Sequence, residues 1–274
     1  MQLQAYFERI GFTGTARVDL ETLREVLRRH VCSVPFENLD VQLERPLTTS
    51  PGAAFEKIVG NGRGGWCYEQ NGLFGWALAE IGFEVTRLAA AVMRQERGEV
   101  STANHLCLRV AVPGSGTDYL ADVGFGGSML APIRFAEGEY SQPPFRIGLQ
   151  RLDDGYWRFW EDGGDGAFSF DFLAKAGDET ALSRRCDFLQ TDPSSGFVQN
   201  LVAQLRLTDS HKTLRGRVFT IKSQDGVTST TLDSAAEVVG TLADHFRLHV
   251  PGVEALWPRI VARHEELFSS TATD

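Results

Sequence analysis

The sequence predicts an α+β fold built from three consecutive segments, residues 1–83, 84–190 and 191–274. Three observations predict it. Up to about residue 83, apolar residues recur at the spacing of helices; from residue 84 the period becomes two, as in antiparallel strands; after residue 190 both patterns occur. The segments are therefore expected to form a helical bundle, an antiparallel sheet or small barrel, and a mixed α/β part. No low-complexity linker separates them, so we expect them to pack as one body.

Two helices are expected in the first segment, because apolar positions lie three and four residues apart. The apolar positions of the first helix are Leu20, Leu23, Leu27 and Val31; those of the second are Leu73, Phe74, Ala77, Leu78 and Ile81. Asp19 is placed to cap the first helix, and Gly82 is placed to end the second. Cys67 therefore lies at or near a helix N-terminus and is approached through glycines.

Alternation of apolar and polar residues predicts the strands. In the middle segment they are expected over 84–93, 105–112, 117–123, 145–152, 156–160 and 168–172. Asp154-Gly155 predicts a hairpin turn between the fourth and the fifth. In the last segment, strands over 217–222 and 227–232 are joined through Asp225-Gly226. A helix is expected over 234–246, with a capping box from Ser234 to Glu237, and a last helix from near Pro258 to Phe268.

The charge and apolar patterns exclude some classes of function. The formal net charge is −9 and Lys and Arg form no basic patch, so we expect no nucleic-acid partner. The longest aliphatic run, Leu88–Met93, is too short to span a membrane, and the first residues lack the pattern of a secretory signal. We therefore expect no membrane association and a cytoplasmic location. The four cysteines are widely spaced and are expected to be free thiols: Cys32, Cys67, Cys107 and Cys186.

The glycine-rich stretch NGRGGWCYEQNG, residues 61–72, raises three possibilities for Cys67 besides a buried structural cysteine. A phosphate-binding loop requires Lys and then Ser or Thr after its last glycine, but Trp66-Cys67 occupies these positions. A metal site with His105 and Cys107 lacks the paired short spacings of zinc ligands, so we expect no metal. A nucleophile fits better, because a helix N-terminus stabilises a thiolate and glycines let a substrate approach the backbone.

A nucleophilic cysteine needs a base and a group that orients the base. His105 opens a strand that returns through the four-residue loop 113–116, and this loop sets the register of the next strand. Counting outward places Asp122 opposite Cys107 and diagonal to His105, on one face of the sheet. Diagonal neighbours lie roughly 7–8 Å apart, within reach of a carboxylate–imidazole hydrogen bond. The sequence therefore predicts a triad of Cys67, His105 and Asp122.

These motifs resemble those of the arylamine N-acetyltransferase family. The family signature R-G-G-x-C-x-E-x-N is present as Arg63, Gly64, Gly65, Cys67, Glu69 and Asn71, and P-F-E-N is present as Pro35, Phe36, Glu37 and Asn38. The family's histidine falls on His105, and its aspartate and glycine loop fall on DVGFGGS, Asp122–Ser128. SGFVQN and TLRGRVFTIK are also similar, and the likeness runs from about residue 5 to residue 250. One departure is Asn104, where the family often has a small or hydroxyl residue.

The resemblance implies a helical bundle that carries the cysteine, a β-barrel that carries the histidine and aspartate, and a C-terminal α/β lid, with a cysteine-protease-like core. It implies ping-pong transfer of an acetyl group from acetyl-CoA, a co-substrate, to the nitrogen of an arylamine or arylhydrazine through acetyl-Cys67, with no tightly bound cofactor. The implied coenzyme contacts are Gly124, Gly126, Gly127 and Ser128, and the implied acceptor pocket is Phe36, Phe125 and Phe197. These phenylalanines could instead be ordinary core residues. Glu37 and Arg63 are either a buried pair that braces the glycines or two exposed side chains.

Other functions stay open. An amide synthase of the same fold would take a polyketide acyl group from a carrier-bound thioester. A hydrolase of cysteine-protease type would admit water to the acyl-enzyme. A non-enzymatic binding module would keep the triad only as scaffold, and the intact set of three residues argues against it. No feature of the sequence sets the preferred amine or the oligomeric state.

Overall fold

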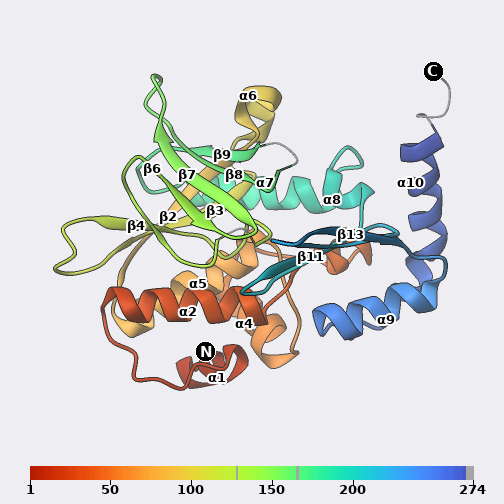
Figure 1. Ribbon diagram of the computed structural model, residues 1–274, viewed down its shortest axis with the longest axis horizontal. Coiled ribbons are helices and arrows are strands. Elements are labelled where there is room, and N and C mark those ends of the chain that lie inside the picture. The colour runs from red at the N-terminus through yellow and green to blue at the C-terminus, as the bar shows by residue number, and fades with distance from the viewer. Residues whose placement is uncertain (128, 165–166, 270–274) are drawn as a thin grey trace.

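The structure is a computed structural model that describes residues 1–127, 129–164 and 167–269, and it has the predicted α+β fold (Figure 1). Helices of the first segment lie on one side, an antiparallel barrel lies next to them, and a second sheet with its own helices lies beside both. The largest hydrophobic core is shared, since it joins Leu27 and Phe74 of the helices to Leu108 and Phe170 of the barrel. A second core joins Leu39 to Leu205 and Phe246 of the last segment, so the three segments pack as one body.

The N-terminal helices are α1 (Leu3–Ile10), α2 (Leu20–Ser33), α3 (Leu39–Gln42), α4 (Pro51–Phe55) and α5 (Cys67–Ile81). Both predicted helices are confirmed together with their end signals. Asp19 Oδ1 accepts the Thr22 N–H at 2.8 Å, and Gly82 ends α5 with a left-handed φ of 112°. The expectation that this segment is helical throughout is wrong at Phe36–Glu37, which form strand β1. Two residues are too few to show a period in the sequence.

The middle segment forms one antiparallel sheet, ordered β5-β4-β3-β2-β9-β8-β7-β6, that curls into a nearly closed barrel. The bounds of β2 to β9 are Glu84–Val92, His105–Ala111, Asp118–Ala121, Ile133–Arg134, Gly138–Gln142, Phe145–Arg151, Trp157–Asp162 and Ala167–Phe172. All six predicted strands are present, and the hairpin turn at Asp154-Gly155 joins β7 to β8. The sequence does not predict β5, β6 or the short helix α6 (Arg94–Arg97) between β2 and β3.

The last segment forms a second antiparallel sheet, ordered β1-β10-β11-β12-β13, which we call the lid sheet. Its strands after β1 are β10 (Val202–Arg206), β11 (Ser210–Arg215), β12 (Val218–Ser223) and β13 (Gly226–Thr231). The predicted hairpin is β12–β13, whereas β10 and β11 are not predicted. Helices α7 (Glu179–Thr191) and α8 (Gly196–Gln199) precede the sheet, and α9 (Ala235–Phe246) and α10 (Trp257–Ser269) follow it. In Figure 1, α9 lies below the sheet and α10 stands at its end.

The capping box predicted for α9 is half correct. Ser234 Oγ accepts the Glu237 N–H at 3.2 Å, as expected of an N-cap. The Glu237 carboxylate, however, accepts the N–H of Asp233 at 2.9 Å rather than that of Ser234. Because the serine cap is retained, α9 begins at Ala235, directly after the predicted cap.

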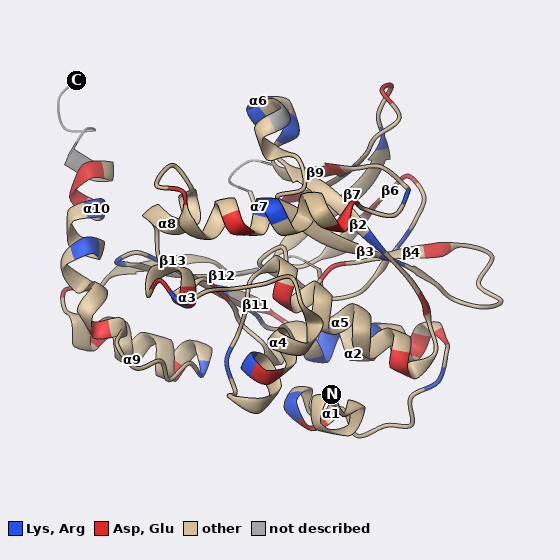
Figure 2. Cartoon of the chain, turned by 180° about the vertical axis from the view of Figure 1, so that it is seen from behind, with Lys and Arg blue, Asp and Glu red and all other residues tan. Residues whose placement is uncertain are grey.

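Figure 2 shows Lys and Arg interspersed with Asp and Glu over the helices of the chain. Among the described residues, none of the helices has both the length and the apolar character that a membrane crossing requires.

Candidate active site

Cys67 is the first residue of α5, and the glycines before it let the chain run close to β1. The Gly65 N–H donates to the Pro35 carbonyl at 3.2 Å, and the Gly65 carbonyl accepts the Glu37 N–H at 3.1 Å. A Cβ on Gly64 would overlap the Pro35 carbonyl oxygen, so a side chain at this position would push the two segments apart. The glycine stretch therefore starts α5 with the thiol inside the protein, where Cys67 is 3% exposed.

The Cys67 sulfur lies against the backbone on both sides of His105. The thiol donates to the Asn104 carbonyl at 3.9 Å, and the Leu106 N–H donates to the sulfur. Burial raises the pKa of the Cys67 thiol, and the hydrogen bond from Leu106 opposes this shift. Asn104, the departure from the family pattern, turns its side chain away, because its Oδ1 accepts the Val92 N–H of β2 at 2.7 Å.

His105 and Asp122 form a buried pair, as the register of the hairpin predicts. Leu108 faces Ala121 across β3 and β4, and this register continued outward pairs Cys107 with Asp122. The His105 Nε2 atom lies 2.6 Å from Asp122 Oδ2, and the two residues are 2% and 3% exposed. The second ring nitrogen, Nδ1, is therefore the one left for a thiol.

Asn71 holds the aspartate in place, a role that the sequence motif does not reveal. Its Nδ2 donates to Asp122 Oδ1 at 2.7 Å and to the Leu106 carbonyl at 2.6 Å, and its Oδ1 accepts the Val123 N–H at 3.0 Å. Asn71 is fully buried. It lies four residues after Cys67 on α5, so both face the barrel. The i,i+4 spacing of Cys67 and Asn71 is the sequence signal that could have revealed this role. Asn71 links the cysteine helix to the strand end that carries Asp122.

The pair of Glu37 and Arg63 is buried, as one of the two readings predicts, and it belongs to a larger ionic cluster. Arg63 Nη2 lies 2.8 Å from Glu37 Oε1 and 3.1 Å from Asp40 Oδ1. Lys57 Nζ lies 2.9 Å from both Asp40 Oδ2 and Glu69 Oε2. Burial raises the pKa of Glu69 to about 7, and Lys57 opposes this shift. The cluster thus sets three buried carboxylates against Lys57 and Arg63, with the more exposed Arg45 3.6 Å from Asp40 at its edge.

This cluster supports the start of α5, because Glu69 Oε2 also accepts the Trp66 N–H at 3.2 Å. Lys57→Met is therefore expected to lower the free energy of unfolding by about 3–5 kcal/mol, since it leaves buried carboxylates without their cation. Arg28→Met is the control, because it removes a half-exposed helix pair with Glu25 worth about 0–1 kcal/mol. Urea unfolding of both variants measures the difference, and equal losses would contradict a stabilising role for Lys57.

The three phenylalanines predicted to line the acceptor pocket fall into two groups. The rings of Phe36 and Phe197 lie 6.1 Å apart, and Trp66 lies 5.5 Å from Phe197. Phe125 instead lies beside the histidine, with its ring 5.3 Å from that of His105. On its far side Phe125 stacks on Phe168 at 5.0 Å, and Phe168 is 39% exposed. One group therefore borders the cysteine helix and the other borders the imidazole.

The glycine loop, residues 124–127, packs against protein on both sides. A Cβ on Gly124 would come within 2.7 Å of the Cys67 Cα, and one on Gly126 would overlap Gln204 of the lid sheet. His211 Nε2 lies 2.7 Å from the Gly126 carbonyl. Burial lowers the pKa of His211 to about 4, so the ring is neutral at pH 7 and donates from Nε2. Close packing between the segments thus explains why this loop has glycines at positions where a side chain would overlap its neighbours. Ser128, the last predicted coenzyme contact, lies outside the described residues.

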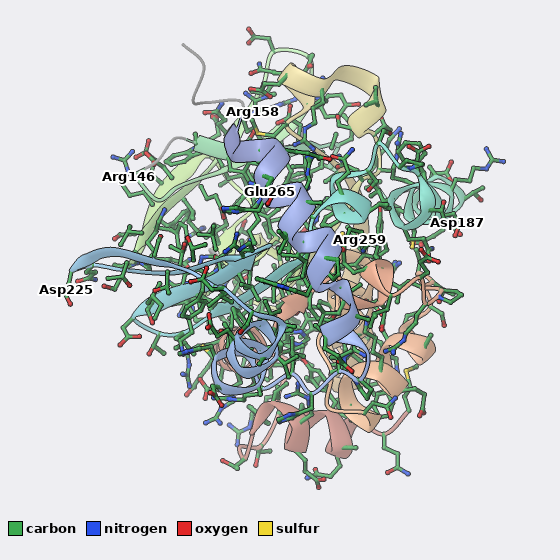
Figure 3. The ribbon with its side chains drawn as sticks, turned by 90° about the vertical axis from the view of Figure 1, so that its right-hand side faces the viewer. Arg146, Arg158, Asp187, Asp225, Arg259 and Glu265 are labelled. Atoms are coloured by element: carbon green, nitrogen blue, oxygen red, sulfur yellow. The ribbon has the colours of Figure 1, made fainter. Side chains whose placement is uncertain are left out.

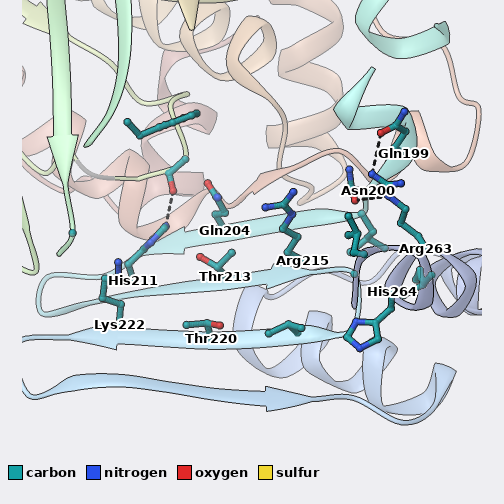
Figure 4. Close-up of a pocket in the computed structure, with 18 of the residues that line it drawn as sticks. Gln199, Asn200, Gln204, His211, Thr213, Arg215, Thr220, Lys222, Arg263 and His264 are labelled. Carbon is teal, nitrogen blue, oxygen red and sulfur yellow. Dashed lines mark hydrogen bonds between the residues drawn. The ribbon is translucent and has the colours of Figure 1, made fainter. Parts of the chain in front are cut away.

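A cleft of about 820 Å³ lies between the barrel and the lid sheet (Figure 4). Phe125 and Gly126 line it on the barrel side, Gln204 and His211 line it on the sheet side, and α10 lines its far end. The volume falls in the range of small-molecule sites, about 300–1,000 Å³. In the part of the chain that the structure describes, no three His, Cys, Asp or Glu side chains are grouped so that they could hold a metal ion.

The comparisons with known proteins agree with this geometry. Residues 19–255 match the family model described as N-acetyltransferase. The chain is 37% identical to the arylamine N-acetyltransferase of Mycolicibacterium smegmatis, over 90% of this chain and 91% of that protein. It is 34% identical to that of Mycobacterium bovis, over 92% and 91%.

Solved structures show the same fold. The structure of the Mycobacterium smegmatis arylamine N-acetyltransferase superposes with a TM-score of 0.87 at 34% identity, covering 96% of this chain and 98% of that one. The Mycobacterium marinum enzyme in complex with CoA superposes with a TM-score of 0.86 at 32% identity, covering 97% and 99%. With its cysteine at a helix start and its histidine–aspartate pair in a barrel, the fold has a cysteine-protease-like core. This chain belongs to the arylamine N-acetyltransferase family of acyltransferases.

Proposed function

We propose that this protein transfers the acetyl group of acetyl-CoA to the nitrogen of an arylamine or arylhydrazine, in two steps and through an acetyl group on Cys67. The observation that carries the proposal is the placement of the Cys67 sulfur between the Asn104 carbonyl and the Leu106 N–H. These groups flank His105, whose ring is held by Asp122 at 2.6 Å. These contacts support a nucleophilic triad of Cys67, His105 and Asp122.

In the first step His105 Nδ1 takes the proton of the Cys67 thiol. Burial raises the pKa of this thiol, so an isolated thiolate is unfavourable, and the imidazolium formed by the same proton transfer supplies the balancing charge. Asp122 stabilises that imidazolium and keeps the ring in the orientation that presents Nδ1. The sulfur attacks the acetyl carbon, the bond to the sulfur of CoA breaks, and His105 returns its proton to the CoA thiolate.

The developing oxyanion needs hydrogen-bond donors. Because Cys67 is the first residue of α5, its own N–H has no intrahelical partner and lies at the positive end of the helix dipole. Backbone N–H groups of this kind stabilise an oxyanion without reorganising during the reaction. We assign the Cys67 N–H to this role.

In the second step the amine attacks the acetyl-cysteine, and neutral His105 takes a proton from the amine nitrogen. The Cys67 thiolate then leaves. Aromatic amines suit this step because they are neutral at pH 7, with the lone pair available. The rings of Phe36 and Phe197, near the start of α5, and that of Phe125, beside His105, offer apolar surface to an aromatic acceptor. The names of the relatives favour acetyl transfer to such amines over an amide synthase that takes its acyl group from a carrier-bound polyketide thioester.

The test combines two measurements on the wild-type protein. In the first, acetyl-CoA and 4-aminobenzoate are varied together and free CoA is followed with a thiol reagent. We expect release that depends on the amine and parallel lines in the double-reciprocal plot. In the second, intact-mass spectrometry after acetyl-CoA alone should show one added acetyl group, located on Cys67 by peptide mapping. Release without amine would indicate a hydrolase, and absence of the adduct would exclude the two-step route.

A further inference from the structure

Three helices of the N-terminal segment are joined by a chain of buried polar side chains. Tyr6 Oη on α1 lies 2.8 Å from His30 Nδ1 on α2, and His30 Nε2 lies 3.2 Å from Gln70 Oε1 on α5. Gln70 Nε2 then donates to the Gly65 carbonyl at 2.8 Å. Tyr6 and His30 are fully buried and Gln70 is 1% exposed. A polar chain in the core is costly unless each member is satisfied, and this one ends at the backbone just ahead of the nucleophile.

The hydrogen bonds of this chain run in one direction. Burial lowers the pKa of His30 to about 3, so its ring is neutral at pH 7 and carries one proton. The Gln70 NH₂ donates to the Gly65 carbonyl, so the amide oxygen of Gln70 faces His30 and accepts from Nε2. His30 Nδ1 therefore accepts from the Tyr6 hydroxyl. Because both of its neighbours are fixed, the Gln70 amide has a single orientation.

Gln70 holds two consecutive peptide groups at the start of α5. Its side chain holds the Gly65–Trp66 peptide by the carbonyl, and the Glu69 carboxylate holds the same peptide by the Trp66 N–H at 3.2 Å. The backbone N–H of Gln70 donates to the Trp66 carbonyl at 2.9 Å, so Gln70 also holds the Trp66–Cys67 peptide. The N–H of that second peptide belongs to Cys67. Because a peptide group is planar and trans, a fixed carbonyl fixes the direction of the N–H.

We propose that Gln70 is a positioning residue for acetyl transfer, whose side-chain amide fixes the Gly65–Trp66 peptide and thereby aims the Cys67 N–H at the oxyanion. This inference rests on the proposed function, because the oxyanion forms only when the thiol attacks an acyl group. Helix ends fray when their backbone bonds alone hold them, and the side-chain bond of Gln70 opposes this fraying. A donor that is oriented in advance needs no reorganisation in the transition state.

Two reactions of Cys67 separate this role from a general effect on the thiol. Acetylation by acetyl-CoA passes through an oxyanion, whereas iodoacetamide loses iodide to the sulfur and forms no oxyanion. In Gln70→Met, the single-turnover rate of acetylation at saturating acetyl-CoA should fall about tenfold to a hundredfold, less than the roughly 10²–10³-fold cost of deleting an oxyanion donor. Alkylation at the same pH should keep the wild-type rate, because it depends on the thiolate and not on the donor.

Gln190→Met is the matched control, since it makes the same substitution at another glutamine that bonds the backbone. Gln190 Oε1 accepts the Leu47 N–H at 2.7 Å, and its Nε2 donates to the Leu47 carbonyl at 2.9 Å. Gln190 lies on α7, and Figure 3 shows Asp187, one turn earlier on this helix, at the edge of the molecule. Gln190→Met should lose stability in urea, as Gln70→Met does, and should keep the wild-type rates of both reactions.

Gln70→Glu tests the hydrogen-bond donor itself and serves as a second variant if Gln70→Met does not fold. The new carboxyl keeps an oxygen for His30 and, while protonated, an O–H for the Gly65 carbonyl; burial favours the protonated form. The ratio of the acetylation rate to the alkylation rate cancels changes in the amount of thiolate. Relative to the wild type, this ratio should be little changed while the carboxyl is protonated and should fall as rising pH ionises it.

Several results would overturn the assignment while leaving the proposed function standing. These are a wild-type acetylation rate in Gln70→Met, equal losses of acetylation and alkylation in that variant, or the same loss of acetylation in Gln190→Met. In Gln70→Glu, a ratio equal to that of the wild type at every pH would also overturn it. Failure of the wild-type protein to form acetyl-Cys67 would instead overturn the proposed function and the assignment with it.

Discussion

Cys67→Ser is expected to lower kcat/KM for acetyl transfer by at least about 10⁴-fold while leaving the free energy of unfolding almost unchanged. The hydroxyl replaces the thiol with little change of shape, so the packing around this buried position survives. A hydroxyl gives up its proton far less readily than a thiol, and an acetyl ester reacts more slowly with an amine than an acetyl thioester does. Steady-state kinetics with acetyl-CoA and 4-aminobenzoate, together with urea unfolding, measure the two quantities.

Cys186→Ser is the matched control for this prediction. Cys186 is buried in the same hydrophobic cluster as Cys67 but does not belong to the triad. Its variant should keep the wild-type rate and should gain one acetyl group from acetyl-CoA, whereas Cys67→Ser should gain none. Appreciable turnover by Cys67→Ser would count against covalent catalysis by this residue.

Asp122→Asn should lower kcat/KM by roughly 10³–10⁴-fold, because it forces the wrong tautomer on His105. In the wild type, Asp122 Oδ2 accepts from Nε2 and leaves Nδ1 free to take a proton. Asp122 Oδ1 already accepts from Asn71 and from the Gly124 N–H, so the amide that replaces the carboxylate would keep its oxygen there and turn its NH₂ toward the ring. The His105 Nε2 atom must then accept a hydrogen bond from the amide, so the ring proton moves to Nδ1. With Nδ1 protonated, the imidazole cannot take the proton of the Cys67 thiol.

The pH dependence of iodoacetamide reaction with Cys67 gives a second readout for Asp122→Asn, since ring orientation governs thiolate formation. Alkylation at neutral pH should slow along with turnover, which a merely structural defect would not require. Asp118→Asn is the control: Asp118 opens β4, the strand that ends just before Asp122, and pairs with Arg109 at the surface, outside the triad. A rate near that of the wild type in Asp122→Asn would remove this residue from the mechanism.

Local patterns explain why much of the fold and the triad could be predicted. The i,i+3/i+4 spacing defines α2 and α5, and the four-residue loop 113–116 sets the register that brings Asp122 to His105. These features depend on residues that are close in the sequence. The thiol position follows from them because α5 begins at Cys67.

The missed features depend on contacts between distant segments, which no local period records. Strand β1 exists because β10 pairs with it, and Lys57 joins the ionic cluster because α5 brings Glu69 to it. The glycine loop illustrates the difference, since the sequence shows that side chains are missing at 124, 126 and 127 but not what approaches them. In the structure it is the cysteine helix and the lid sheet.

Strand β1 has a consequence for how substrates enter. One edge of β1 pairs with β10, and its other edge bridges to Gly65, two residues before the nucleophile. Asn38 adds to this seam, since its side chain bonds the backbone of Phe197, Asn200 and Val202. If the C-terminal part opened as a hinge at this position, these backbone hydrogen bonds would have to break in each catalytic cycle. We therefore expect the C-terminal part to stay docked during turnover and substrates to reach the sulfur through side-chain movements at the cleft.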